Sequence, residues 1–484
     1  MKKLVQSGAS IAMLFSASIF ANAQVAKELK FPNPQGLQMF GFSVNEFNGN
    51  SIIGTEFADG INVFQGGVFK YQVLGPLGSR FGHSVGLNSG WTAAGAHLLF
   101  PEERGAVYLA QHLNGQPQRN FNVKINSLAN AAFDHFGKSL DLFNDWMVVG
   151  APNVNRPEHG GYAEVWKHTN GTWARRTVVR PANLPLNADF GFSVAIRNDR
   201  MVVGAPGISK IFIYKLINNV WTLEQQYQPD KFTWAKVADF GSYKEYYWNF
   251  GYDLDITDGH IIIGDPTARK AGIIAFQNNF WTLIRTFTPP ATALNSGDMF
   301  GVSVAIRYNR AAVGAPRPAG SGNNNGQGKV YMYTDGYQFK GTMYVGNPSH
   351  LEVLALGYDI SIESDNVLAG ASNTHNFSSV RVEGAAFRMP FYFVTQSGNW
   401  RLENGTDAED KSQSSLFPNP ATGNEVMYNA GENLLGVEAI SAAGETISLH
   451  HVGNQIKVGD LNPGMYFLKI STESGFKNVK FIKE

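Results

Sequence analysis

A fixed interval between two glycine motifs, repeated seven times, constrains the fold more than any other feature of the sequence. The first motif is a glycine that follows Phe or Leu, and its copies are Gly41, Gly82, Gly137, Gly191, Gly251, Gly301 and Gly357. The second motif is a glycine followed by a small or acidic residue, and its copies are Gly54, Gly95, Gly150, Gly204, Gly264, Gly314 and Gly370. Each second glycine lies 13 residues after its first. An interval kept this strictly indicates a repeat protein.

Each repeat reads as short strands joined by tight turns. An apolar run at 193–196 is followed by a polar turn at 198–199 and a second apolar run at 201–203, which is typical of a β-hairpin. A third run follows at 211–214 and a fourth after the next turn. The pattern predicts an all-β fold, a seven-bladed β-propeller of four-stranded antiparallel blades, with a solenoid or two β-sandwiches as the alternative. We expect the paired glycines where neighbouring blades approach near the axis, with the Phe between blades.

Composition excludes several classes of protein. Lys+Arg and Asp+Glu both number 39, so the formal net charge is zero, whereas a nucleic-acid-binding protein needs a basic surface. The chain has no cysteine, which removes disulfides, thiolate nucleophiles and Cys-ligated zinc.

The N-terminal segment predicts a signal peptide over residues 1–23. Lys2 and Lys3 precede an apolar stretch at 11–20, and Ala21-Asn22-Ala23 fits a cleavage site. A buried N-terminal helix is the alternative. The apolar stretch is too short to cross a bilayer, and no later apolar segment is long enough to do so. No transmembrane segment is therefore predicted.

The two glycine motifs, read with their neighbours, carry a family resemblance. The strand Phe190-Gly191-Phe192-Ser193-Val194-Ala195 and the strand Val202-Val203-Gly204-Ala205-Pro206 resemble the FG-GAP repeat of integrin α-subunit propellers and their bacterial relatives. The likeness covers residues 38–402 and implies an interaction module that acts in adhesion or ligand binding.

The calcium loop of some integrin repeats is not carried over, because the turns between the first two strands are too short. The nearest approach is Asp253, Asp255 and Asp258, where Thr257 occupies the third ligand position and no carboxylate closes the loop. These three residues are weak metal candidates, and no cofactor is predicted.

The C-terminal segment carries a second resemblance. A polar linker at 403–415 is followed by Leu416-Phe417-Pro418-Asn419-Pro420 and by two further blocks at 460–470 and 476–482. Together they are similar to the type A sorting domain of the type IX secretion system of Bacteroidetes. The resemblance implies a small β-sandwich over 416–484, the type IX secretion machinery as a partner, and a secreted or outer-surface location after passage through the periplasm. Residues 24–402 are then the propeller.

Few residues suggest chemistry. The segment 82–86 fits the G-x-S-x-G nucleophile elbow, yet its serine is in register with serines of other repeats, so we interpret it as a structural strand residue. His135 and His159 lie beside Asp134 and Glu158 in loops of the third repeat. A metal or acid–base cluster there is an alternative to solvated loop polarity. No catalytic residue is predicted.

The connections between strands differ between the two faces of the predicted ring. Those joining strands 1–2 and 3–4 are short, whereas those joining strands 2–3 and 4–1 are longer and variable, as recognition loops on a rigid frame usually are. We therefore expect a protein or glycan ligand at the second face. The longest insertion, 226–249, is rich in aromatic residues that either contact a ligand or fill a local core. Besides Phe232, the candidate ligand-binding residues are Trp234, Tyr243, Tyr246, Tyr247 and Trp248.

The sequence thus predicts a secreted or surface-attached binding or adhesion module. The alternatives are a secreted enzyme, for example one acting on polysaccharide, and a structural surface component. An enzyme would bring two or three carboxylates or histidines together over the mouth of the ring. Two alternatives remain for ring closure: residues 27–31 add a strand to the last blade, or residues 400–403 complete it.

Overall fold

The chain forms two compact units, residues 1–404 and 405–484. The computed structural model describes residues 27–29, 39–99, 103–127, 132–152, 160–239, 244–289, 298–316, 328–334, 336–345, 355–364, 366–372, 384–390, 398–402, 416–417, 421–428, 434–441, 446–472 and 475–483. The expected signal peptide at 1–23 and linker at 403–415 lie outside these residues. Within the described ranges, no helix has the length and apolar character needed to cross a membrane.

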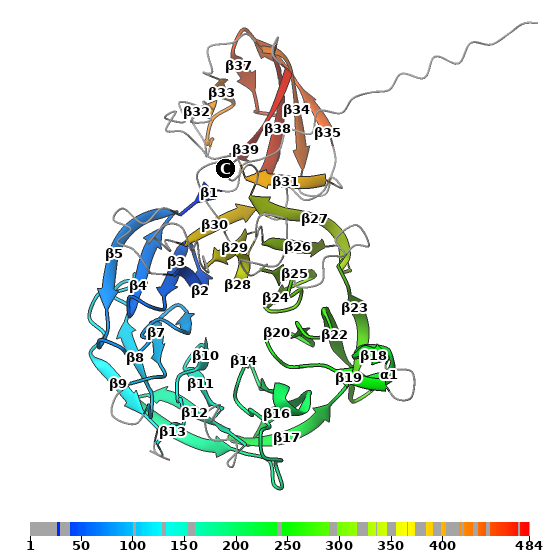
Figure 1. The fold of residues 1–484 in the computed structure, drawn as a ribbon. Helices are drawn as coiled ribbons and strands as arrows, with labels where there is room; N and C mark the ends of the chain where they lie inside the picture. Colours follow the sequence, from blue (N-terminus) through cyan, green and yellow to red (C-terminus); the bar gives the residue numbers. More distant parts are fainter. Residues whose placement is uncertain are drawn as a thin grey trace, which may run out of the picture. The chain divides into compact units, whose positions relative to one another are not determined.

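Seven sheets of the first unit stand around a central axis as the blades of a β-propeller, which confirms the predicted fold class (Figure 1). In six blades the strands follow chain order from the axis outward, and the seventh takes its outer strand from the N-terminal segment. The strands are, blade by blade, β2 (Phe40–Phe47), β3 (Asn50–Thr55), β4 (Gly60–Gln65) and β5 (Val68–Leu74); β6 (Val85–Leu87), β7 (Trp91–Ala96), β8 (Ala106–Gln111) and β9 (Val123–Asn126); β10 (Ser139–Phe143), β11 (Trp146–Ala151), β12 (Tyr162–Thr169) and β13 (Thr172–Val179); β14 (Val194–Arg197), β15 (Arg200–Ala205), β16 (Lys210–Ile217) and β17 (Val220–Tyr227); β20 (Leu254–Thr257), β21 (His260–Asp265), β22 (Lys270–Gln277) and β23 (Phe280–Phe287); β24 (Val304–Arg307), β25 (Arg310–Ala315), β26 (Lys329–Thr334), β27 (Gln338–Val345) and the added β31 (Gly398–Leu402); β28 (Leu356–Glu363), β29 (Asn366–Ala371), β30 (Ala385–Pro390) and β1 (Lys27–Glu28).

The 13-residue interval is explained by contacts that the two glycines make. Within a blade, Gly191 N donates to Gly204 O at 2.9 Å, which places the two glycines side by side across the β14–β15 hairpin. Between blades, a Cβ added to Gly204 would lie 2.3 Å from Gly251 O and 2.2 Å from Ser193 Oγ. Only glycine therefore permits the approach of one blade to the next at this point.

The aromatic residue of each motif packs between blades. Phe190 is fully buried in a cluster with Val165 of the third blade and Val203 of the fourth. The equivalent Phe136, Phe250 and Phe300 have no exposed surface either. This confirms the expectation that the repeated Phe is an inter-blade core residue.

The ring closes through the N-terminal segment. Strand β1 pairs antiparallel with β30, with Lys27 opposite Arg388 and Glu28 opposite Phe387. The next residue, Leu29, is 1% exposed, and its N donates to Ala386 O at 2.8 Å. The first of the two closure alternatives is therefore the correct one.

The other alternative, in which residues 400–403 complete the last blade, is wrong. Strand β31 instead runs parallel to β27 as a fifth strand of the sixth blade, with Trp400 opposite Met343. The physical reason is that β1 occupies the edge of β30, so β31 pairs with a different open edge.

The second unit consists of two four-stranded sheets, which agrees with the β-sandwich that its resemblance implied. One sheet holds β32 (Leu416–Phe417), β33 (Glu425–Tyr428), β37 (Gln455–Lys457) and β36 (His451–Val452), and the other holds β35 (Thr446–Leu449), β34 (Leu434–Ser441), β38 (Gly464–Thr472) and β39 (Gly475–Lys483). A single hydrophobic cluster joins them, with Val426 and Ile456 from the first sheet and Val437, Leu468 and Phe481 from the second.

Candidate functional site

The two faces of the ring are built differently. On one face, two-residue turns such as Asn170-Gly171 and Asn218-Asn219 join strands, and both residues of each turn have positive φ, as tight hairpins require. The other face carries the 2–3 and 4–1 connections. The connection from β17 to β20 adds the helix α1 (Lys231–Trp234) and the hairpin β18 (Lys236–Asp239) and β19 (Lys244–Tyr247). A short 3-10 helix, η2 (Pro206–Ile208), lies in a 2–3 connection.

Trp234 anchors this added element to the ring rather than facing a ligand. Its ring is 2% exposed, lies 5.1 Å from the Phe250 ring between centroids, and its Nε1 donates to Asp265 Oδ2 at 2.8 Å. Lys270 Nζ donates to the backbone oxygens of Thr233 and Trp234, each at 2.7 Å. The bases of α1 and the hairpin are therefore held by the fifth blade.

The remaining aromatic candidates divide between surface and packing. Phe232 is 66% exposed and Tyr247 is 42% exposed, while Tyr246 is half-buried with its ring 5.4 Å from that of Phe232. Trp248 is half-buried against the blade core, and Tyr243 lies outside the described residues. The aromatic set on this element is thus Phe232 and Tyr247, which are exposed, and Tyr246, which is half-buried beside Phe232.

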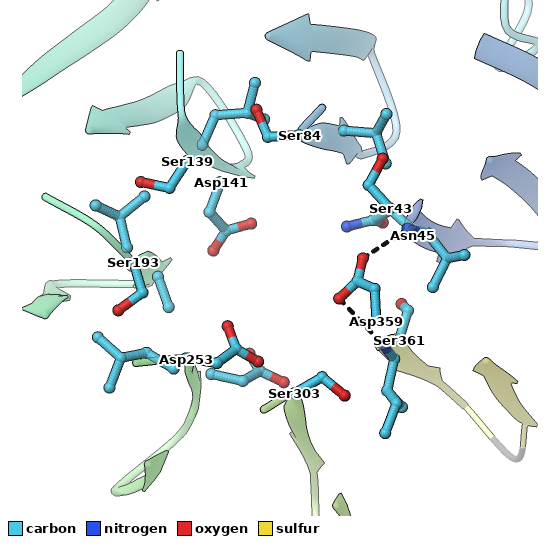
Figure 2. A pocket seen from close by; sticks show the side chains of 18 of the residues that line it. Ser43, Asn45, Ser84, Ser139, Asp141, Ser193, Asp253, Ser303, Asp359 and Ser361 are labelled. Carbon is cyan, nitrogen blue, oxygen red and sulfur yellow. Dashed lines mark hydrogen bonds between the residues drawn. The ribbon is translucent and has the colours of Figure 1, made fainter. Parts of the chain in front are cut away.

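A polar cavity of about 430 Å³ lies on the axis of the ring. Figure 2 shows Asp141, Asp253 and Asp359 pointing into its centre, with the serines of the repeated strands around them. The innermost strand of every blade contributes to its wall. The cavity is therefore a product of the repeat itself.

The side chain two residues after each first-motif glycine links one blade to the next. Ser193 Oγ donates to Gly251 O at 2.8 Å, and Ser43, Ser84, Ser139 and Ser303 make the same bond to the next blade's glycine. The serine of the apparent nucleophile elbow, Ser84, is thus a blade-to-blade donor, which agrees with its structural interpretation.

Aspartate replaces serine at this position in two blades and accepts a bond instead. Asp253 Oδ2 accepts from Val304 N at 2.7 Å, and Asp359 Oδ2 accepts from Val44 N at 2.6 Å. Two residues further along their own strands, Asp255 Oδ2 accepts from Ile306 N at 2.7 Å. These carboxylates satisfy amides at the unpaired inner edge of the neighbouring sheet.

Burial shifts the ionisation of the cavity carboxylates. It raises the pKa of Asp255 and Asp359 to about 7 and that of Asp141 to about 6. Burial, with the negative charge of Asp359 adding to it, raises the pKa of Asp253 well above its usual value. Backbone N–H donors to these groups oppose the shifts without cancelling them.

The three weak metal candidates are not brought together as a calcium loop. Asp253 and Asp255 bind backbone amides of the sixth blade, whereas Asp258 lies in an exposed turn and accepts from the Asn198 side chain. Among the described residues, no group of three or more His, Cys, Asp or Glu side chains could hold a metal ion.

A row of three histidines beside the cavity was not predicted as a unit. Ring centroids of His83 and His97 are 4.1 Å apart, and those of His97 and His135 are 5.7 Å apart. Glu56 Oε1 lies 3.1 Å from His83 Nδ1, and Glu103 Oε2 lies 3.0 Å from His135 Nε2. Burial lowers the pKa of His83 and of His97 well below the usual value. The row is therefore a set of buried imidazoles flanked by two carboxylates.

A sequence signal for this row exists in the repeat register. Glu56 and His97 stand where four other repeats have the proline of their second motif, and His83 directly follows a first-motif glycine. Of the loop residues singled out from the sequence, His135 belongs to the row, while Glu158 and His159 lie outside the described residues.

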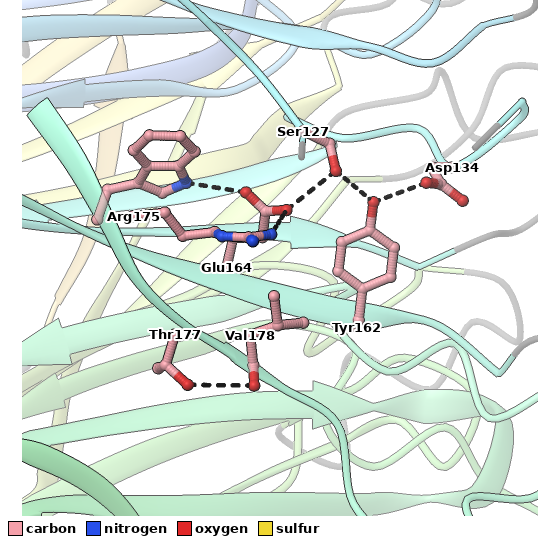
Figure 3. A network of polar contacts seen from close by, with 8 residues as sticks. Ser127, Asp134, Tyr162, Glu164, Arg175, Thr177 and Val178 are labelled. Atoms are coloured by element: carbon pink, nitrogen blue, oxygen red, sulfur yellow. Dashed lines mark hydrogen bonds and ion pairs between the residues drawn. The ribbon is translucent and has the colours of Figure 1, made fainter. Parts of the chain in front are cut away.

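A second polar network joins the second and third blades (Figure 3). Ser127 Oγ lies 2.7 Å from Tyr162 Oη and donates to Glu164 Oε1 at 3.0 Å, and Tyr162 Oη donates to Asp134 Oδ2 at 2.7 Å. Arg175 Nη1 pairs with Glu164 Oε1 at 3.2 Å, and Glu164 is fully buried. The buried Glu164 carboxylate is thus ion-paired and hydrogen-bonded, and the network links the two blades.

The ring and the separate sandwich define the class of an all-β propeller protein with an appended small domain. Comparison with protein families gives two matches: residues 281–333 match the FG-GAP repeat, and residues 415–484 match the secretion system C-terminal sorting domain. The chain thus carries an FG-GAP repeat at 281–333, within the propeller, and a secretion system C-terminal sorting domain at 415–484. A domain of this kind marks a protein for export, so the propeller is secreted or held at the outer surface.

Other comparisons add little. No curated protein matches the chain. A solved structure, the β-propeller domain of Cps50 (Swd1) from Myceliophteria thermophila, is 9% identical, covers 73% of this chain and 97% of its own, and has a TM-score of 0.46. The fold assignment rests on the seven sheets themselves.

Proposed function

We propose that this protein is an exported binding module that recognises a protein or glycan with the face carrying the 2–3 and 4–1 connections. The observation that carries the proposal is the anchored aromatic set on that face, Phe232, Tyr246 and Tyr247. Exposed aromatic rings supply large contact areas to proteins and stack on sugar rings.

Anchoring supports this role because a preorganised surface loses little conformational entropy on binding. Asp230 Oδ1 accepts from Phe232 N at 2.7 Å and caps α1, and Trp234 fixes the other end of the helix in the blade core. Lys231 Nζ lies 5.0 Å from the Phe232 ring centroid and 5.4 Å from that of Tyr246. The aromatic set therefore carries a positive charge beside it.

The burial of the histidine row argues against an acid–base role for these three side chains. His97 and His135 are 6% and 4% exposed, and His83 is 9% exposed. A general acid or base must reach its substrate within hydrogen-bonding distance. The packing of these side chains instead supports a role in joining blades.

The test is binding of the full exported chain to glycan arrays and immobilised extracellular-matrix proteins. We expect Phe232→Ala/Tyr247→Ala to weaken binding to the ligand so found by about tenfold or more, as truncation of aromatic hot spots does. The matched control is Val220→Ala/Phe280→Ala, which removes residues 60% and 65% exposed beside turns on the opposite face. Loss of binding in both double variants, or in neither, would contradict the proposed face.

A further inference from the structure

Lys138 is an amine in the wall of the axial cavity. It directly follows the first-motif glycine of the third blade and is half-buried. Among the described residues that line the cavity, it is the only lysine; the other cations, Arg197 and Arg307, lie at the far ends of their inner strands. Aromatic residues fill the equivalent position in four other blades: Phe42, Phe192, Tyr252 and Tyr358. An amine therefore replaces an aromatic ring at one point of this wall.

The ammonium group of Lys138 makes no close polar contact within the described part of the chain, although the charges of Glu56 and Arg80 act on it through space. Its Nζ forms no hydrogen bond or ion pair with any residue that the structure describes, and its nearest recorded partner is the Phe192 ring, 5.8 Å away at the centroid. Lys270 is the contrasting case, because its Nζ is held by two backbone oxygens at 2.7 Å each. Lys138 thus has its lone pair available once it loses a proton.

The surroundings of Lys138 favour that loss. Burial, and after it the positive charge of Arg80, lowers the pKa of Lys138 to about 8, while the Glu56 carboxylate opposes the shift. The neighbouring His83 and His97 are held neutral by burial and offer no compensating negative charge. About a quarter of the amine is then unprotonated at pH 7.5, against about 0.1% for an ordinary lysine.

We propose that Lys138 captures small aldehydes that enter the axial cavity by forming an imine at Nζ. The neutral amine attacks the carbonyl carbon, the N–C bond forms, and the carbonyl oxygen leaves as water with the two protons that the nitrogen loses. No oxidant or reductant takes part. Lys138 is the only lysine among the described residues that line the polar cavity of about 430 Å³, and a polar cavity suits polar aldehydes such as the open-chain forms of small sugars.

The test traps the imine in the full chain. Glyceraldehyde and sodium cyanoborohydride are added at pH 7.5, and reductive alkylation at each lysine is followed over time by peptide mass spectrometry. We expect Lys138 to be modified about tenfold faster or more than the exposed Lys231 and Lys244, and Lys270 to stay slow. Glycerol, which has no carbonyl group, gives no modification.

A pH series separates reactivity from simple exposure. The rate at Lys138 is expected to level off above about pH 8, whereas the rate at an ordinary lysine in a model peptide keeps rising to pH 10. Lys138→Arg should abolish the fast phase, and Phe232→Ala/Tyr247→Ala should leave it intact, so failure here is distinct from failure of the proposed binding face. Modification of Lys138 no faster than Lys231 at pH 7.5 would overturn the proposal without need of any variant.

Discussion

At Gly95 the absence of one methyl group decides whether two blades can meet. A Cβ at this residue would lie 2.1 Å from Gly137 O and 2.3 Å from Ser84 Oγ. We expect Gly95→Ala to lower the free energy of unfolding of the propeller by about 1–3 kcal/mol, the usual cost of overpacking. Chemical denaturation of the full chain measures it.

The control for this substitution lies in the same blade. A Cβ at Gly90 would meet nothing closer than 3.9 Å, so Gly90→Ala should change stability by less than about 0.5 kcal/mol. If the two substitutions lowered the free energy of unfolding equally, the close contact of the blades at Gly95 would not be the reason that glycine is needed there.

At the scale of the strand, the innermost strands couple blade contacts to pH. Burial raises the pKa of Asp255 to about 7, so between about pH 4 and pH 7 the folded protein keeps a proton that the unfolded chain has released. The contribution of protonated Asp255 to the free energy of unfolding is therefore greatest in acid and is lost as the pH rises to about 7. His83 and His97 act in the opposite sense, because their lowered pKa values cost stability as the pH falls below about 6.5.

Comparing the melting temperature of an Asp255 variant with that of the unmodified protein separates the effect of this aspartate from that of the other titrating groups. We expect the melting temperature of Asp255→Asn, relative to the unmodified protein, to increase between pH 5 and pH 8, because only the carboxylate becomes charged. The control is Asp258→Asn, at an exposed turn one residue beyond the same strand. An offset for Asp255→Asn that is the same at both pH values would contradict the coupling.

At the scale of the whole molecule, one short strand closes the ring. Leu29 is 1% exposed and packs with Phe40 and Leu368 at the junction of the first and last blades. Leu29→Ala should destabilise the propeller by about 2–5 kcal/mol through the cavity it leaves. Leu77→Ala, at a residue 98% exposed, should have no measurable effect in the same thermal unfolding experiment; an equally silent Leu29→Ala would argue that β1 does not hold the ring closed.

Ring closure also marks the limit of what could be predicted from sequence. The 13-residue interval predicts the blades because both glycines of a repeat lie in one hairpin, so the constraint is local. Residues 27–31 and 400–403 both suit an edge strand, and the partner of each is set by which sheet edge is open in the folded ring. No local sequence pattern indicates which edge is open.

The same distinction applies to the candidate site. The aromatic content of 226–249 identified the insertion, but it did not show which aromatic side chains are exposed. Trp234 is buried and Tyr247 is exposed because of what each packs against in the folded protein. His83 and His135 of the histidine row, and Glu56 beside it, come from three different repeats. The sequence could have indicated the row only by comparing equivalent positions of the repeats and finding those that differ from the common residue.

The pairing of β1 with β30 joins residue 27 to residue 388, so the contact that completes the ring has nearly the largest sequence separation the propeller allows. Bringing such distant segments together carries a large loop-closure entropy, and contacts of this kind form late in folding. Each blade, in contrast, is a meander of neighbouring strands that can form early. We therefore expect an open array of blades to precede the closed ring, with the surfaces of Phe40 and Leu368 exposed at its two ends until β1 is in place. We expect this chain to be most prone to aggregation in the interval before closure, when that apolar surface is exposed.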